Sequence, residues 1–175
     1  MNELFTLSVQ DVSPAFMQNA LLTLLCVKYL GAPMEKALAT LENYTPVEGR
    51  GNVEIVDGVT VIDDSYNANP LSMKAALDRA LSMKPASGHA FAIVGQMGEL
   101  GTRSDELHKA LAETVNKFDG VYVVGEAAQI LYDALRPDVK KGFYVSGNDL
   151  PYDEISSLLH DGDIIVIKGS KVITY

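Results

Sequence analysis

The fold is decided by the stretch Val61-Ile62-Asp63-Asp64-Ser65-Tyr66-Asn67-Ala68-Asn69-Pro70, in which an apolar segment runs directly into acids and amides. The β-branched residues at its start favour an extended strand. Pro70 suits the first position of a helix, and apolar residues then recur at helical spacing, at Met73, Ala76, Leu77, Ala80 and Leu81. A strand, a polar turn and a helix in this order place ligands at the carboxyl edge of a parallel sheet.

Strands and helices alternate through the rest of the chain. Asp57-Gly58 between two β-branched segments predicts a tight hairpin turn. The later strands are continuous apolar runs, as expected for a parallel sheet covered by helices on both faces. The expected strands are 90–94, 121–124, 143–145 and 164–167, and the expected helices are 104–118, 126–135 and 151–160. We therefore predict an α/β fold, a Rossmann-like doubly wound and mostly parallel sheet with an N-terminal β-hairpin.

Residues 1–45 have a different character, with a possible short strand at 5–9 and helices at 14–30 and 34–41. Two helices are too little to bury a core, so we expect a helical appendage, or the tail of a preceding domain. Residues 46–175 form the main domain. Cys26 lies in the apolar first helix, where we expect it to pack as a small hydrophobic side chain.

Composition excludes several classes of function. The chain has 175 residues with 14 Lys and Arg against 23 Asp and Glu, so its net charge of -9 disfavours nucleic-acid binding. Its one cysteine allows no intrachain disulfide or thiolate metal cluster and fits a reducing cytoplasm. Polar residues interrupt the apolar run 15–30, so we expect no membrane span. Met1-Asn2-Glu3 lacks the positive start of a signal peptide. A cytoplasmic protein with small-molecule ligands is expected.

The turn after Val61-Ile62 offers the strongest candidate site. Asp64 could accept hydrogen bonds from ribose hydroxyls or hold a metal-bound water, and the amides of Asn67 and Asn69 could meet a polar ligand. Alternatively, the acid only ends a strand and Asn69 only caps the helix. The density of polar groups favours a ligand site.

Other motifs are weaker. The Arg50 guanidinium could stack on a base or fork onto phosphate oxygens, or it could simply be solvated. The loop 95–101 could face a ligand or make a tight connection, and both interpretations stay open. Lys168 and Ser170 follow the last apolar strand, where a lysine could meet a carboxylate or phosphate. The three histidines form no metal-ligand pattern and are expected at the surface.

The sequence contains no G-x-x-x-x-G-K-[ST] motif, the loop that usually holds ATP phosphates. We therefore expect no ATP hydrolysis by this chain alone.

With these residues the chain resembles the C-terminal part of the Mur ligase family, on the branch that joins D-alanyl-D-alanine to UDP-N-acetylmuramoyl-tripeptide. The resemblance runs from about residue 13 almost to the end, and Asp-Ser-Tyr-Asn-Ala-Asn-Pro is its most specific signature. The matching stretches are Asn19-Ala20, Gly49-Arg50, 63–70 with Ser72-Met73, 95–101, Glu106-Leu107-His108, Val124-Gly125 and Lys168-Gly169-Ser170.

The resemblance implies a three-domain ligase that uses ATP and Mg²⁺, held mostly by a central domain, with residues 1–45 resembling the end of that domain. The last domain would close as a lid and receive the amine substrate. Arg50 resembles the linker arginine that contacts ATP, and Asp64 the acid at the nucleotide ribose. The resemblance places Asn67, Asn69 and Pro70 in the loop facing the amine, and Lys168 and Ser170 near the same cleft.

The sequence also departs from the family. Ala15-Phe16 stand where a His-Asn pair is usual, Gln96 replaces an acid, Gly98 replaces a bulkier residue, and a last helix is expected after Lys171 but the chain stops at Tyr175. Two alternatives to the ligase that adds D-alanyl-D-alanine stay open. One is a stand-alone binding or regulatory module on the same scaffold, and the other is a domain like that of folylpolyglutamate synthetase.

Overall fold

The computed structural model describes residues 4–9, 14–45 and 47–170. The chain divides into two compact units, Met1–Pro46 and Val47–Tyr175. The predictions for Met1 to Glu3 and for the segment after Ser170 lie outside the described residues.

The first unit contains two helices, α1 (Pro14–Tyr29) and α2 (Met34–Glu42). The expected strand at 5–9 is wrong, because residues 4–9 adopt no regular structure. Cys26 is exposed, so its predicted packing is also wrong. Apolar residues are spread around most of the surface of α1. Helix α2 buries no residue of its own and cannot cover the apolar surface of α1. Phe16 contacts Tyr44, with 5.9 Å between ring centroids.

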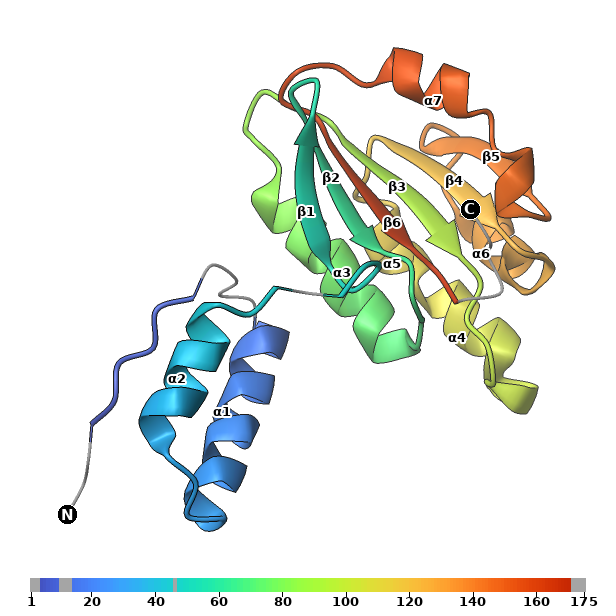
Figure 1. Ribbon diagram of the computed structural model, residues 1–175. Coiled ribbons are helices and arrows are strands. Elements are labelled where there is room, and N and C mark those ends of the chain that lie inside the picture. Colours follow the sequence, from blue (N-terminus) through green and yellow to red (C-terminus); the bar gives the residue numbers. More distant parts are fainter. Residues whose placement is uncertain (1–3, 10–13, 46, 171–175) are drawn as a thin grey trace. The chain divides into compact units, whose positions relative to one another are not determined.

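The second unit is built on one sheet of six strands (Figure 1). They are β1 (Asn52–Val56), β2 (Val59–Asp64), β3 (Ala90–Gly95), β4 (Gly120–Val124), β5 (Lys140–Tyr144) and β6 (Ile164–Lys168). Their order in space is β1-β2-β6-β3-β4-β5, and only β1 is antiparallel to its neighbour. The last strand thus lies between β2 and β3, and the carboxyl ends of β2, β6 and β3 come side by side.

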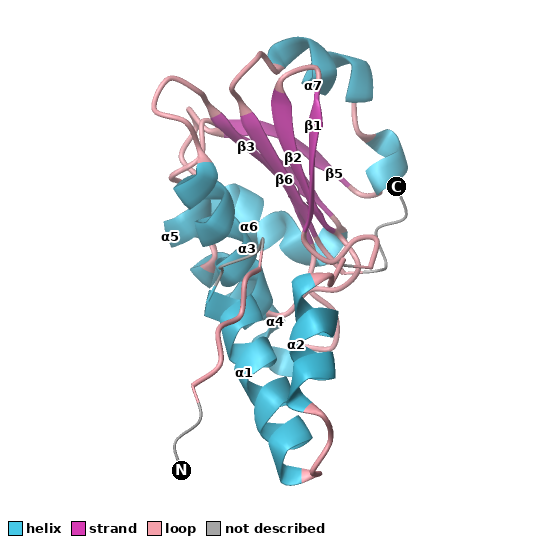
Figure 2. Cartoon of the chain, turned by 60° about the vertical axis from the view of Figure 1, so that its left-hand side comes forward, coloured by secondary structure: helices cyan, strands magenta, loops and turns pink. Residues whose placement is uncertain are grey.

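The connections place the helices on the sheet. Each parallel crossover is right-handed, so reversing the direction of travel along the sheet moves the helix to the opposite face. The chain moves one way from β2 to β5 and then returns to β6. Figure 2 shows the result, with α3 to α6 on one face and α7 on the other. These helices are α3 (Pro70–Met83), α4 (Ser104–Ala110), α5 (Ala112–Val115), α6 (Gln129–Ala134) and α7 (Tyr152–Leu158).

Two apolar clusters hold the layers together. The larger lies under α3 to α6 and includes Ile62, Met73, Leu77 and Val166, which are fully buried. The smaller lies on the other face, where Leu150 and Ile155 from the α7 segment pack with Phe91. The predicted α/β fold with its hairpin is confirmed. Within residues 47–170, however, one face carries four helices and the other carries one.

Two predicted helices differ in detail. The helix expected at 104–118 is divided at Leu111, whose N–H donates to the His108 carbonyl three residues back, at 3.2 Å. The helix expected at 126–135 begins as a 3₁₀ turn, Glu126–Ala128. None of the helices in the described ranges combines the length and apolar character needed to cross a bilayer.

Candidate functional site

The turn between β2 and α3 is held by hydrogen bonds to its own backbone and to the connector before β1. The Asp63 carboxylate accepts from the Ser65 N–H at 3.1 Å, and the Tyr66 N–H donates to the Gly49 carbonyl at 2.9 Å. Gly49 is buried with φ of 72°, and a Cβ there would lie 3.1 Å from the Tyr66 nitrogen. The positive φ and this close approach both favour glycine, and the approach brings Arg50 to the turn.

Asn69 and Pro70 begin α3. The Asn69 side chain accepts from the Ser72 N–H at 2.9 Å, and the Ser72 hydroxyl accepts from the Asn69 N–H at 3.1 Å. This reciprocal pair is a capping box, and Pro70 follows at the first helical position. Asn69 therefore caps the helix, as the alternative to a ligand-binding role predicted. Its predicted ligand-binding role stays a prediction.

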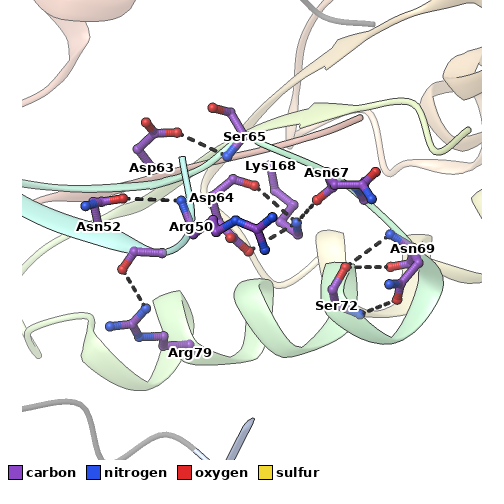
Figure 3. Close-up of polar contacts among 12 residues, drawn as sticks. Arg50, Asn52, Asp63, Asp64, Ser65, Asn67, Asn69, Ser72, Arg79 and Lys168 are labelled. Carbon is purple, nitrogen blue, oxygen red and sulfur yellow. Dashed lines mark hydrogen bonds and ion pairs between the residues drawn. The ribbon is translucent and has the colours of Figure 1, made fainter. Parts of the chain in front are cut away.

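Lys168 ends β6 and is 1% exposed. Its ammonium group donates to the Asp64 carbonyl at 3.1 Å and to the Asn67 carbonyl, and it lies 3.1 Å from the Asp64 carboxylate (Figure 3). An ammonium has three donors, and these three oxygens account for them. Lys168 thus joins the end of β2 to the turn rather than pointing its charge at solvent.

Asp64 carries the most informative electrostatics in this turn. Burial raises the pKa of its carboxyl, and the nearby Lys168 and Arg79 cations only partly oppose that rise. The Asp64 side chain is 26% exposed, so solvent can reach it while it is paired with Lys168. A half-buried acid next to a fixed cation is an oriented hydrogen-bond acceptor.

Arg50 stacks on Tyr66, with its guanidinium carbon 4.1 Å from the ring centroid. Nearby, Arg79 on α3 donates to the Gly51 carbonyl at 3.0 Å. Figure 3 shows Arg50 and Asp64 close together, with Asn67 on the far side of Lys168. The structure therefore gathers Arg50, Asp64, Asn67 and Lys168 at one edge of the sheet, and Asn69 begins the adjoining helix.

Ser170 lies apart from this group, against the loop after β3. Its N–H donates to the Gln96 carbonyl at 2.9 Å, and the Gln96 N–H donates to the Val124 carbonyl at 2.9 Å. The Gln96 side chain accepts from the Ala127 N–H at 3.1 Å. A Cβ on Gly98 would lie 3.3 Å from the Ser170 hydroxyl, so the small residue lets Ser170 approach closely. The two departures at Gln96 and Gly98 thus take part in local contacts.

His108 was expected at the surface, and that prediction is wrong. It is fully buried, and its ring contacts the Met97 N–H and the Ser104 carbonyl, each at 2.8 Å. A signal was present in the sequence. His108, Leu111 and Val115 are spaced i, i+3 and i+7, so they share the buried face of the helical segment.

Within the described ranges, no group of three or more His, Cys, Asp or Glu side chains is arranged to hold a metal ion. The donor set at this edge, with Asp64 beside a lysine, fits a hydroxyl-rich or amide ligand better than a divalent cation.

The fold and this edge define a Rossmann-like α/β domain with its polar groups at the carboxyl ends of β2 and β6. The chain belongs to the Mur ligase family, because the family model described as Mur ligase, glutamate ligase domain, matches residues 49–171.

Individual proteins with similar sequences and structures are also Mur ligases. The UDP-N-acetylmuramoyl-tripeptide--D-alanyl-D-alanine ligase of Rickettsia prowazekii is 32% identical over 174 residues, covering 97% of this chain and 38% of the relative. Among solved structures, the MurF ligase of Thermotoga maritima in complex with ADP is 30% identical with a TM-score of 0.71, covering 85% of this chain and 33% of that one. MurF from Acinetobacter baumannii is 27% identical with a TM-score of 0.79, covering 94% and 37%. The chain thus spans less than two fifths of these proteins.

Proposed function

We propose that this chain is the substrate-binding lid domain of an ATP-dependent ligase that adds D-alanyl-D-alanine to UDP-N-acetylmuramoyl-tripeptide. The names of its relatives support this substrate pair. One observation carries the proposal, namely the convergence of Arg50, Asp64, Asn67 and Lys168 at the carboxyl edge of β2 and β6. A cytoplasmic location, where such precursors would be made, belongs to the same proposal.

The nucleotide would meet the Arg50 side of this edge. One face of the Arg50 guanidinium lies on Tyr66, and such a cation can offer its remaining donors or its other face to a nucleotide. The Asp64 carboxylate, oriented by Lys168, would accept hydrogen bonds from the ribose hydroxyls. ATP and Mg²⁺, when bound, supply activation of the tripeptide carboxylate, and we assign their main binding site to the remaining ligase domains.

The amine substrate would meet the segment of Asn67, Asn69 and Pro70. Asn67 is exposed, and its side chain accepts from the Ala68 N–H at 2.8 Å, which orients the amide. Lys168 fixes the Asn67 carbonyl, so we assign to Lys168 an indirect role in binding. Ser170 would contribute from the neighbouring loop. Orientation of the amine toward an activated carboxyl group is the main contribution that such a domain can make to the reaction.

Residues 1–45 are proposed to be the end of the central domain of such a ligase, as their resemblance implies. The second unit would then close over that domain as a lid. The proposed partners of the chain are the remaining ligase domains, the UDP-muramoyl peptide and D-alanyl-D-alanine.

A titration followed by amide NMR tests this proposal. D-alanyl-D-alanine should shift the amide signals of Asn67 and Asn69, whereas L-alanyl-L-alanine should shift them far less. ADP should shift those of Arg50 and Tyr66. Asn67→Ala should abolish the dipeptide response, and the matched control Asn148→Ala, an exposed asparagine beyond β5, should keep it.

The same titration separates the alternatives. A response to glutamate instead of the dipeptide would favour a folylpolyglutamate synthetase-like domain. A dipeptide response without any ATP-dependent amide formation, after the UDP-sugar and ATPase domains of a relative are added, would favour a non-catalytic module. Absence of shifts at residues 64–70 with all ligands would contradict the proposed site.

A further inference from the structure

His108 occupies an unusual position for a polar residue. It lies on α4 and is fully buried on the same side as the apolar residues Leu111 and Val115. Its ring reaches out of the helix to the loop after β3, where its Nε2 atom lies 2.8 Å from the Met97 nitrogen. A side chain from one element thus holds the main chain of another.

Two contacts of the ring determine its tautomer, and a third, between Nδ1 and the Ser104 hydroxyl at 3.3 Å, fits either tautomer because a hydroxyl can donate or accept. The Met97 N–H can only donate, so Nε2 must present a lone pair. The Ser104 carbonyl can only accept, so Nδ1, 2.8 Å away, must carry the proton. The bonded ring is therefore the neutral imidazole with its proton on Nδ1.

The contact at Met97 is continuous with the candidate site. Gln96, the next residue back, accepts through its carbonyl from the Ser170 N–H at 2.9 Å. Ser170 follows Lys168 by two residues, and Lys168 holds Asp64 and the Asn67 carbonyl. A shift of Met97 would therefore be passed along the backbone to the end of β6 and the turn after β2.

The loop also contains a strained residue. Glu99 is not a glycine, yet it adopts a left-handed backbone with φ of 60°. Such a conformation persists only where the surroundings determine it. Met97 on one side is anchored by His108, and the Arg103 N–H on the other donates to the Leu100 carbonyl at 3.3 Å.

We propose that His108 is a positioning residue that, as the Nδ1–H tautomer, fixes the loop 95–101 and, through the hydrogen bond of that loop to Ser170, the end of β6 where Lys168 pairs with Asp64. An apolar residue would fill the same space on the buried face. Only a group with an acceptor at the Nε2 position and a donor at the Nδ1 position satisfies both Met97 and Ser104. The part of this inference that concerns ligand affinity rests on the proposed function above.

Two variants separate the two hydrogen bonds of His108. In His108→Gln the Oε1 atom can take the place of Nε2 and accept from Met97, whereas in His108→Asn the amide nitrogen can take the place of Nδ1 and reach only Ser104. Amide hydrogen exchange of the chain without ligand should be about tenfold faster at Met97 and Ser170 in His108→Asn, as the loss of one net hydrogen bond implies. His108→Gln should keep both amides near their original rates.

Nitrogen-15 NMR of the original chain provides a test that needs no variant. It should show an unprotonated Nε2 and a protonated Nδ1. The proposal would be overturned by a protonated Nε2, by equal exchange at Met97 in the Gln and Asn variants, or by acceleration that is spread over the whole sheet. The latter result would indicate a general loss of stability.

Ligand affinity separates this inference from the proposed function. We expect His108→Asn to weaken D-alanyl-D-alanine binding about three- to tenfold and His108→Gln to restore most of it. If the exchange rates behave as expected but the chain binds neither dipeptide nor ADP, the positioning role of His108 in the loop stands and the proposed function fails. If the ligands bind but both variants bind equally, the link from His108 to the edge fails.

Discussion

Strand β6 has a buried charged side chain at each of its ends, and the two are held differently. Asp163, immediately before the strand, is 3% exposed and accepts from the backbone N–H groups of His89 and His160, at 2.7 and 2.9 Å. Lys168, at the other end, donates to backbone carbonyls of the polar turn and pairs with the carboxylate of Asp64. The amino end therefore ties the sheet to its own loops, whereas the carboxyl end orders a turn that faces solvent.

The pKa values reflect this difference. Burial alone would raise the pKa of Asp163, but the two N–H donors and the His89 ring hold it below its usual value. At Asp64 burial dominates and the pKa is raised despite the lysine. Hydrogen bonds within the fold thus outweigh burial at the Asp163 carboxylate, whereas burial outweighs the ion pair at the Asp64 carboxylate.

The largest effect should come from the carboxyl end. Lys168→Met leaves the Asp64 carboxylate and two carbonyls without their cation, so we expect the free energy of unfolding to fall by about 3 kcal/mol. Urea denaturation measures it, with exposed Lys141→Met as the control. A fall below about 1 kcal/mol would mean that water replaces the lysine easily and that the two ends differ less than the structure indicates.

Asp163→Asn should rank second. The substitution keeps one acceptor, but its NH₂ group then faces an N–H donor, so we expect a loss of about 2 kcal/mol in the free energy of unfolding. Exposed Asp161→Asn in the same loop is the matched control, expected to stay within about 0.5 kcal/mol. Equal effects at both positions would show that the buried charge contributes nothing specific.

Acid should act on the two carboxyl groups in opposite senses. The contribution of Asp163 to stability is complete above its unfolded-state pKa, about 3.9, and is lost as the pH falls through its lower folded-state pKa. The contribution of Asp64 is complete below about pH 3.9 and is lost as the pH rises through its raised folded-state pKa. Relative to the original chain, unfolding measured between about pH 2 and pH 7 should show a shallower acid loss for Asp163→Asn and a steeper one for Asp64→Asn. Parallel profiles for all three chains would contradict these assignments.

A smaller effect is expected at the start of α3. Asn69→Ala removes one half of the capping box and should lower the free energy of unfolding by about 1 kcal/mol. Asn69→Ser should recover most of that loss, because serine also caps helices. If both variants are as stable as the original chain, the cap contributes little, and a ligand-binding role becomes the better explanation for this residue.

The smallest effect concerns Arg50 and Tyr66. A double-mutant cycle with Arg50→Ala and Tyr66→Leu should give a coupling of about 0.5–1 kcal/mol, typical of an exposed cation–π pair. Unlike Lys168, whose substitution should mainly lower stability, Arg50 should matter more for nucleotide binding than for folding. ADP affinity, measured by calorimetry on Arg50→Ala, should fall while thermal stability hardly changes.

The parts of the fold that could be predicted were those with an unambiguous pattern. The strand that leads into Asp63 and Asp64, the turn and the helix beginning at Pro70 were predicted because apolar periodicity and turn chemistry agree there. Residues 5–9 and Cys26 were predicted wrongly because their surroundings depend on what packs against them, which local pattern does not contain. His108 was missed because a polar residue type was given more weight than its position on the helix.

The shared position of Asp64 and Lys168 was predictable, but the bonds between them were not, and Ser170 lies apart from this group. Strand ends bring Asp64 and Lys168 to one edge of the sheet, and this follows from a parallel arrangement. Lys168 can reach Asp64 and the Asn67 carbonyl only because β6 lies next to β2 in the sheet. These bonds therefore depend on the order of the strands. Apolar strand patterns do not determine that order, so Lys168 was predicted to meet a carboxylate or phosphate near the cleft, and its bonds to the turn were not predicted.

The late position of β6 in the chain also bears on biosynthesis. Lys168 and Asp64 are 104 residues apart in the sequence, and without β6 the β1–β2 hairpin has no hydrogen-bonded connection to β3, β4 and β5. While the ribosome is still making residues 164–168, the nascent chain can hold only two partial sheets with unpaired edges. Folding of this unit should therefore be slow and should wait for the synthesis of β6, and chaperones that shield exposed strand edges should increase its yield.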